Sequence, residues 1–196
     1  KNTFLNKIDN MYECIELWGS ECLDFINNKH DIDIVVISKK NIEPKTLRDI
    51  LFYQPHSEGW TYKDKYNLCI KVNPINYFTE LEKTNNIMCY LFQQKYKKVL
   101  FGKSDYYISD VLKNKENNKN NLKKFAADLQ KFASNNKHKG WYIIYSGICT
   151  LNNNSYEFTD EQKTNINILH DCLDTNDLLK KWCCEQLGLE YKKESN

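Results

Sequence analysis

The sequence predicts an α+β fold in which a small mixed β-sheet is followed by a mainly helical C-terminal region. Strand-like runs are concentrated before Pro74, and helical periodicity dominates after it. Elements that alternate in this way near the start of a chain are typical of a small sheet covered by helices. At 196 residues the chain is long enough for two small domains, which we place at residues 1–78 and 79–196.

The elements predicted before Pro74 come from the spacing of apolar residues. Apolar residues three and four apart indicate helix, whereas β-branched runs and strict alternation indicate strand. In chain order these elements are a helix over about residues 2–13, a strand over 14–18, a strand over 32–37, a short helix from Pro44 to Pro55 and a strand over 66–72.

The second half carries amphipathic patterns that predict helices. The polar run from Lys113 to Asn121 is a loop or the exposed end of a helix, and Gly188 is placed to cap the last helix. The predicted helices cover about residues 122–132, 141–151, 161–173 and 177–187.

Composition narrows the function classes. The net charge of +2 gives no basic field of the kind that alone indicates nucleic-acid binding. Arg48 is the single arginine, so phosphate must be held by lysines and backbone N–H groups. The eight cysteines show no CxxC pair or zinc spacing, which predicts buried, reduced thiols. No apolar run could span a bilayer, and we expect a cytoplasmic protein that does not bind membranes.

One segment carries a recognisable chemistry: Gly19-Ser20, then ten residues, then Asp31 and Asp33. A glycine followed by a small hydroxyl residue at a strand end lets backbone N–H groups approach phosphate oxygens. Residues two apart in a strand point the same way, so Asp31 and Asp33 present two carboxylates to one spot. Such a pair suits Mg²⁺, which binds through one or two carboxylates plus substrate phosphates. The alternative is a surface strand whose aspartates are merely solvated.

This arrangement resembles the signature of the nucleotidyltransferase superfamily with the polymerase β-like fold. The signature is a hydrophobic residue, Gly, Gly or Ser, nine to thirteen residues, then Asp, hydrophobic, Asp or Glu, hydrophobic. Trp18-Gly19-Ser20 and Asp31-Ile32-Asp33-Ile34 match each of these positions. The segment Lys97 to Gly102 resembles a "valine-leucine-tyrosine-glycine" stretch of the aminoglycoside-type and minimal members. Glu21-Cys22-Leu23 replaces a basic stretch of the polymerase β relatives, which favours the branch with small acceptors.

The resemblance also implies a third carboxylate on a later strand, where it serves as metal ligand or general base. Asn67 occupies the position that aligns with it, and Asp64 could substitute if the strand is shifted. An amide binds a metal weakly and cannot act as a base. Asn67 therefore marks the catalytic position at which this chain departs from the family pattern.

The resemblance implies transfer of a nucleoside monophosphate from a nucleoside triphosphate, with ATP the expected donor, to a hydroxyl of a small-molecule acceptor. Gly19 and Ser20 would hold the phosphates, Asp31 and Asp33 the Mg²⁺, and the nucleotide would lie between the two domains. Two alternatives stay open. One is a polymerase β-like or tailing enzyme that acts on nucleic acid, and the other is a nucleotide-binding regulatory or antitoxin-type protein with a degenerate site. A protein or tRNA acceptor is not distinguished from a small molecule.

Overall fold

The structure is a computed structural model of the whole chain. It describes residues 12–28, 32–39, 54–56, 59–63, 68–74, 96–103, 115–131, 138–171 and 176–193. The chain divides into two compact units, and each is described by itself. The first unit comprises Lys1–Asp24, Lys29–Lys83 and Tyr96–Tyr107, and the second comprises Phe25–Asn28, Thr84–Lys95 and Ile108–Asn196.

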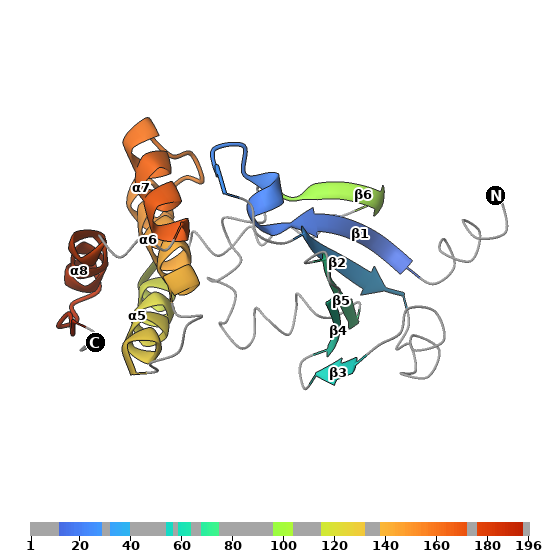
Figure 1. Cartoon of the computed structure of the whole chain (residues 1–196), viewed down its shortest axis with the longest axis horizontal. Helices are drawn as coiled ribbons and strands as arrows, with labels where there is room; N and C mark the ends of the chain where they lie inside the picture. The colour runs from blue at the N-terminus through green and yellow to red at the C-terminus, as the bar shows by residue number, and fades with distance from the viewer. Residues whose placement is uncertain are drawn as a thin grey trace, which may run out of the picture. The chain divides into compact units, whose positions relative to one another are not determined.

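The first unit is built on a six-stranded mixed sheet with the order β3-β4-β5-β2-β1-β6. Strands β2 and β5 are parallel, and every other neighbouring pair is antiparallel. The strands, shown in Figure 1, are β1 (Tyr12–Trp18), β2 (Ile32–Ser38), β3 (Gln54–His56), β4 (Gly59–Lys63), β5 (Leu68–Pro74) and β6 (Lys98–Gly102).

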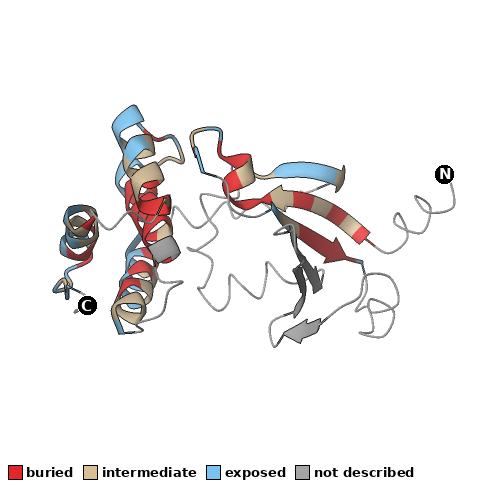
Figure 2. Cartoon of the chain, viewed as in Figure 1, coloured by how far each residue is buried: buried red, intermediate tan, exposed pale blue. Residues whose placement is uncertain are grey.

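Strand β1 has one buried and one half-buried face, as Figure 2 shows. Tyr12, Cys14, Glu16 and Trp18 are buried, and the residues between them are half-buried. The alternation follows from the two-residue period of a strand. Strand β6, at the edge of the sheet, is mostly exposed, with Leu100 56% accessible. Trp18, at the loop end of β1, is therefore as buried as the residues in the middle of the strand.

The second unit contains four described helices: α5 (Lys115–Lys131), α6 (His138–Asn153), α7 (Asp160–His170) and α8 (Asp177–Gln186). Helix α6 is the most buried of them, since nearly every described residue from Trp141 to Leu151 is inaccessible (Figure 2). Helix α7 begins with a capping box between Thr159 and Gln162, which satisfies two of the backbone N–H groups that a helix start leaves open.

The α+β architecture with strands first and helices later is confirmed, but several predicted element bounds are corrected. Strand β1 begins at Tyr12, inside the helix predicted over 2–13, and the rest of that prediction lies outside the described residues. Pro55 lies in β3 and not at the end of a helix. Strand β6 lies beyond the boundary placed at residue 78 and yet pairs with β1.

The helical predictions agree more closely. The polar run before Asn121 is the start of α5, so the helix-end alternative is correct from Lys115 onward. Gly188 has a positive φ of 63° and donates its N–H to the carbonyl of Glu185 at 3.1 Å, as a helix C-cap does. No helix in the described ranges is long and apolar enough to cross a membrane.

Candidate nucleotide and metal site

The predicted phosphate turn follows directly after β1 and faces the predicted metal strand. Trp18 and Asp33 are the last register partners of the antiparallel pair β1–β2. Gly19 then begins the short 3₁₀ helix η1 (Gly19–Cys22) with a φ of +75°, a conformation that costs residues with a side chain about 1–2 kcal/mol. A Cβ placed on Gly19 would collide with Oδ2 of Asp33 and lie 3.3 Å from its Cγ. The carboxylate of Asp33 thus lies directly against the backbone of the turn.

Ser20 contributes a buried hydroxyl to the same turn. The residue is 4% accessible, and its Oγ has no hydrogen-bond partner in the structure. Leaving a buried polar group unsatisfied costs about 1–3 kcal/mol. A hydroxyl kept in this state beside a carboxylate-bearing strand is suited to a ligand that brings its own acceptor, such as a phosphate oxygen.

Glu16, in the strand that precedes the turn, forms a buried ion pair with Lys97 that was not predicted from the sequence. Glu16 is fully inaccessible; its Oε1 lies 3.1 Å from Nζ of Lys97, and its Oε2 accepts a 2.7 Å hydrogen bond from the indole of Trp18. Burial and the neighbouring Glu16 carboxylate raise the pKa of the Cys14 thiol to about 12. The available signal was an acidic residue on the apolar face of a strand, between Cys14 and Trp18.

The Glu16 network fixes the residue that precedes the phosphate turn. A buried carboxylate that is both paired and hydrogen-bonded holds its partners in one geometry, because removing either partner would leave an uncompensated charge. Trp18 is therefore held from β1 through its indole, while its backbone is paired with Asp33. The position of Gly19 follows from that of Trp18.

The other two predicted site residues, Asp31 and Asn67, lie outside the described residues. Each directly precedes a member of the parallel pair Ile32 and Leu68, which are register partners in β2 and β5. Within the described ranges, no group of three or more His, Cys, Asp or Glu side chains could hold a metal ion. Of the predicted site, the structure thus brings together Gly19, Ser20 and Asp33.

The segment that connects η1 to β2 belongs in part to the helical unit. Residues Phe25–Asn28 are counted with that unit, and their polar groups bond to helix α7. The N–H of Asn27 donates to Oδ1 of Asn167 at 3.0 Å, and Asn28 Nδ2 donates to Oδ2 of Asp171 at 2.9 Å. Nothing in the sequence spacing indicated these contacts, because about 140 residues separate the partners.

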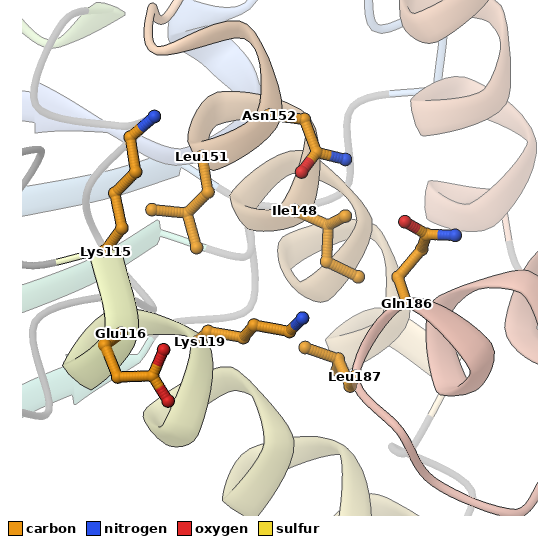
Figure 3. Close-up of a pocket in the computed structure, with 8 residues that line it drawn as sticks. All are labelled: Lys115, Glu116, Lys119, Ile148, Leu151, Asn152, Gln186 and Leu187. Atoms are coloured by element: carbon orange, nitrogen blue, oxygen red, sulfur yellow. The ribbon is translucent and has the colours of Figure 1, made fainter.

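The helical unit also contains a cavity of about 310 Å³, drawn in Figure 3. Its apolar lining comes from Ile148, Leu151 and Leu187, which are buried. Exposed polar residues, among them Lys119 and Asn152, form the rest of the lining. None of the predicted site residues lines it.

Comparison with known proteins adds a likeness of fold. No protein-family model matches the sequence, and no curated protein matches it by sequence comparison. Among solved structures, the chain is similar to spectinomycin adenyltransferase AAD(9) from Enterococcus faecialis, solved with ATP and spectinomycin. The TM-score is 0.53 at 11% sequence identity, over 93% of this chain and 94% of that one. The chain therefore shares the fold of that adenyltransferase.

Proposed function

We propose that the protein is a Mg²⁺-dependent nucleotidyltransferase that moves AMP from ATP to a hydroxyl of a small-molecule acceptor. The observation that carries the proposal is the contact of the Asp33 carboxylate with the backbone of the Gly19 turn, beside the partnerless hydroxyl of Ser20. A carboxylate and a phosphate-binding turn at one spot are what a metal-bound triphosphate requires. The fold shared with an adenyltransferase solved with ATP and spectinomycin supports both the donor and the class of acceptor.

The residues of the turn have separate tasks in this proposal. The backbone N–H groups that begin at Gly19 bind the β and γ phosphates, and the Ser20 hydroxyl donates to a phosphate oxygen. Asp33, together with Asp31, holds Mg²⁺, which when bound neutralises charge on the leaving pyrophosphate. The acceptor hydroxyl forms a new bond to the α-phosphorus while the bond to pyrophosphate breaks. Its proton passes to solvent water, because the amide of Asn67 cannot accept it.

Asn67 favours one second candidate. An amide cannot accept that proton, so a protein with Asn at this position could bind ATP without transferring it. That candidate is a nucleotide-binding regulatory protein with the same fold. Pyrophosphate release by the natural chain in the presence of a hydroxyl acceptor distinguishes the two. If Asn67 stands at the position of the third carboxylate, Asn67→Asp releases pyrophosphate faster than the natural chain.

The site is tested by calorimetric titration with a non-hydrolysable ATP analogue, with and without Mg²⁺. We expect Mg²⁺-dependent binding that Asp33→Asn weakens at least about a hundredfold, since even outer-shell changes at metal sites cost about 10–100-fold. Asp128→Asn is the matched control, because it makes the same change at a half-buried carboxylate on α5 that forms an ion pair with Lys131. Equal affinity of the Asp33→Asn variant and the natural chain would contradict the proposal.

A further inference from the structure

The cavity of the helical unit is bordered by residues of α5, α6 and the end of α8 (Figure 3). Helices α5 and α6 approach closely next to it, because a Cβ on Gly147 would lie 2.8 Å from Cδ2 of Leu122. The next residues of α6 on the cavity side are Ile148 and Leu151, and the open space begins there. All of the described lining residues belong to the second unit, so the cavity is a feature of that unit.

The floor of the cavity is apolar. Ile148, Leu151 and Leu187 are 4%, 8% and 3% accessible, and each borders the open space. Apolar side chains beside a void lack dispersion contacts, which the apolar part of a ligand would supply. The volume of about 310 Å³ corresponds to roughly ten non-hydrogen atoms if each takes about the share of one water molecule. The cavity therefore suits a small molecule with a hydrocarbon body.

The rim on the α5 side has a net positive charge. Lys115 and Lys119 line the cavity one helical turn apart, and Lys123, one turn further, has its Nζ 3.9 Å from the position of a Cβ on Gly188. Like charges four residues apart destabilise a helix, and a bound anion would relieve their repulsion. Within the described ranges, neither Lys115 nor Lys119 has an ion pair with another residue. Glu116 is the one acidic residue of the described lining.

Two amides complete the described rim. Asn152 lies near the end of α6 and Gln186 is the last residue of α8, and both are exposed. In the part of the chain that the structure describes, neither side chain forms a hydrogen bond, so each can donate its NH₂ group to an anion. Figure 3 shows the Lys119 side chain extending from α5 toward Ile148 and Leu187. Donors and apolar surface thus meet in one cavity.

We propose that this cavity binds a small amphipathic anion, which has an apolar body and a carboxylate or phosphate head. The body packs on the three buried apolar residues, and the head accepts hydrogen bonds from Lys115 and Lys119. A neutral ligand would leave the positive rim without a partner, and a small inorganic anion would leave the floor uncovered. The inference does not rest on the proposed function, because no described residue of the nucleotide site lines the cavity.

The test is calorimetric titration of the full chain with octanoate, which matches the cavity in size. We expect saturable binding with a Kd below about 1 mM. The affinity should fall by up to about fourfold for each methylene group removed, through hexanoate to butanoate. Octanol, which has the same body without the charge, should bind at least about threefold more weakly. Octyl phosphate distinguishes the heads, since tighter binding than that of octanoate would identify phosphate as the preferred group.

A charge reversal on α5 tests the role of the rim. Lys119→Glu should weaken octanoate binding about fivefold to tenfold, because an attraction is replaced by a repulsion. The variant should fold normally, since a glutamate at this position can pair with Lys115 and Lys123 one turn away. Lys124→Glu is the matched control, because it makes the same change at an exposed residue of α5 outside the described lining. It should bind octanoate like the natural chain.

The location of the bound anion is read from methyl resonances in the NMR spectrum. Octanoate should shift the methyl signals of Ile148 and Leu151 in the natural chain, and in Lys119→Glu only at higher concentration. Absence of saturable binding by both octanoate and octyl phosphate would overturn the proposal. So would equal affinity for octanoate in Lys119→Glu and the natural chain, or binding of octanol as tight as that of octanoate.

Discussion

Two carboxylates on the same face of neighbouring strands have opposite surroundings. Glu16 lies opposite Val35 within the sheet, is fully buried and has both of its oxygens engaged by Lys97 and Trp18. Asp33 lies at the loop end of the same ladder, is half-buried and contacts the glycine of a turn. Directly opposed residues of an antiparallel pair share a face, so the two sites differ in depth and not in orientation.

The comparison separates a position in the sheet interior that stabilises the fold from a position at the strand end that, in the proposed function, binds a metal. A carboxylate in the interior must be paired at all times, because its desolvation has no other compensation. A carboxylate at the strand end can accept a metal from solution. A carboxylate therefore stabilises the fold at one position and, in the proposed function, binds the metal two residue pairs away. Three substitutions challenge this division, and they are ordered by the size of the expected effect.

The largest effect is expected from breaking the interior pair. Glu16→Gln leaves Lys97 buried without its counter-charge and should lower the free energy of unfolding by about 3–5 kcal/mol, measured by urea denaturation. The double variant Glu16→Leu, Lys97→Met removes both charges and should recover much of the loss. A single Glu16→Gln variant as stable as the natural chain would show that the pair contributes nothing to the fold.

The second effect concerns the glycine at the strand end. Gly19→Ala must adopt a positive φ and also meet Asp33, whereas Gly188→Ala meets only Lys123 Nζ at 3.9 Å. Both should lose about 1–2 kcal/mol through the backbone conformation. Gly19→Ala should lose about 1–3 kcal/mol more through the collision and should also bind the Mg²⁺–ATP analogue more weakly. Equal thermal stability of the two variants would mean that Asp33 does not lie against the turn.

The smallest effect on stability is expected from Ser20→Ala, and it should have the opposite sign to the other two. Ser20→Ala removes a buried hydroxyl that has no partner, so the free energy of unfolding should rise by up to about 1 kcal/mol. The affinity for the Mg²⁺–ATP analogue should fall about tenfold, because a hydrogen bond to a charged phosphate is lost.

Ser146→Ala provides the opposite control for this prediction. The Ser146 hydroxyl is equally buried but donates to the carbonyl of Tyr142 at 2.6 Å. Its removal should lower stability by about 1 kcal/mol and leave nucleotide affinity unchanged. Loss of stability in Ser20→Ala would contradict the view that its hydroxyl is reserved for a ligand.

The sequence was most informative where a single element carried its own signal. The β-branched run after Asp31 predicted β2 almost to the residue, and Gly188 predicted the end of α8. The hairpin of β3 and β4 was missed because Pro55 was assigned to a helix end, although proline is also tolerated in edge strands. Strand β6 was missed because Val99 and Leu100 remain exposed and show no alternation of burial.

The site could be predicted only as far as neighbouring parts of the chain define it. The spacing of Gly19, Ser20 and Asp33 predicted that they would lie together, and the register of β1 with β2 brings them together. Lys97 could not be identified in that way. Its partner Glu16 lies about 80 residues away in the sequence, and a single sequence contains no signal for such a pair.

The hydrogen bond between Asn27 and Asn167 can form only late during synthesis of the chain. Asn27 is translated 140 residues before Asn167, an interval of roughly 7–28 seconds at usual elongation rates. Strands β1 and β2 leave the ribosome early, but α7, which bonds to the segment at Asn27, comes among the last elements. A nascent chain halted before Thr159 would therefore contain Gly19, Ser20 and Asp33, while Asn27 and Asn28 would still lack the partners that they have in the complete chain.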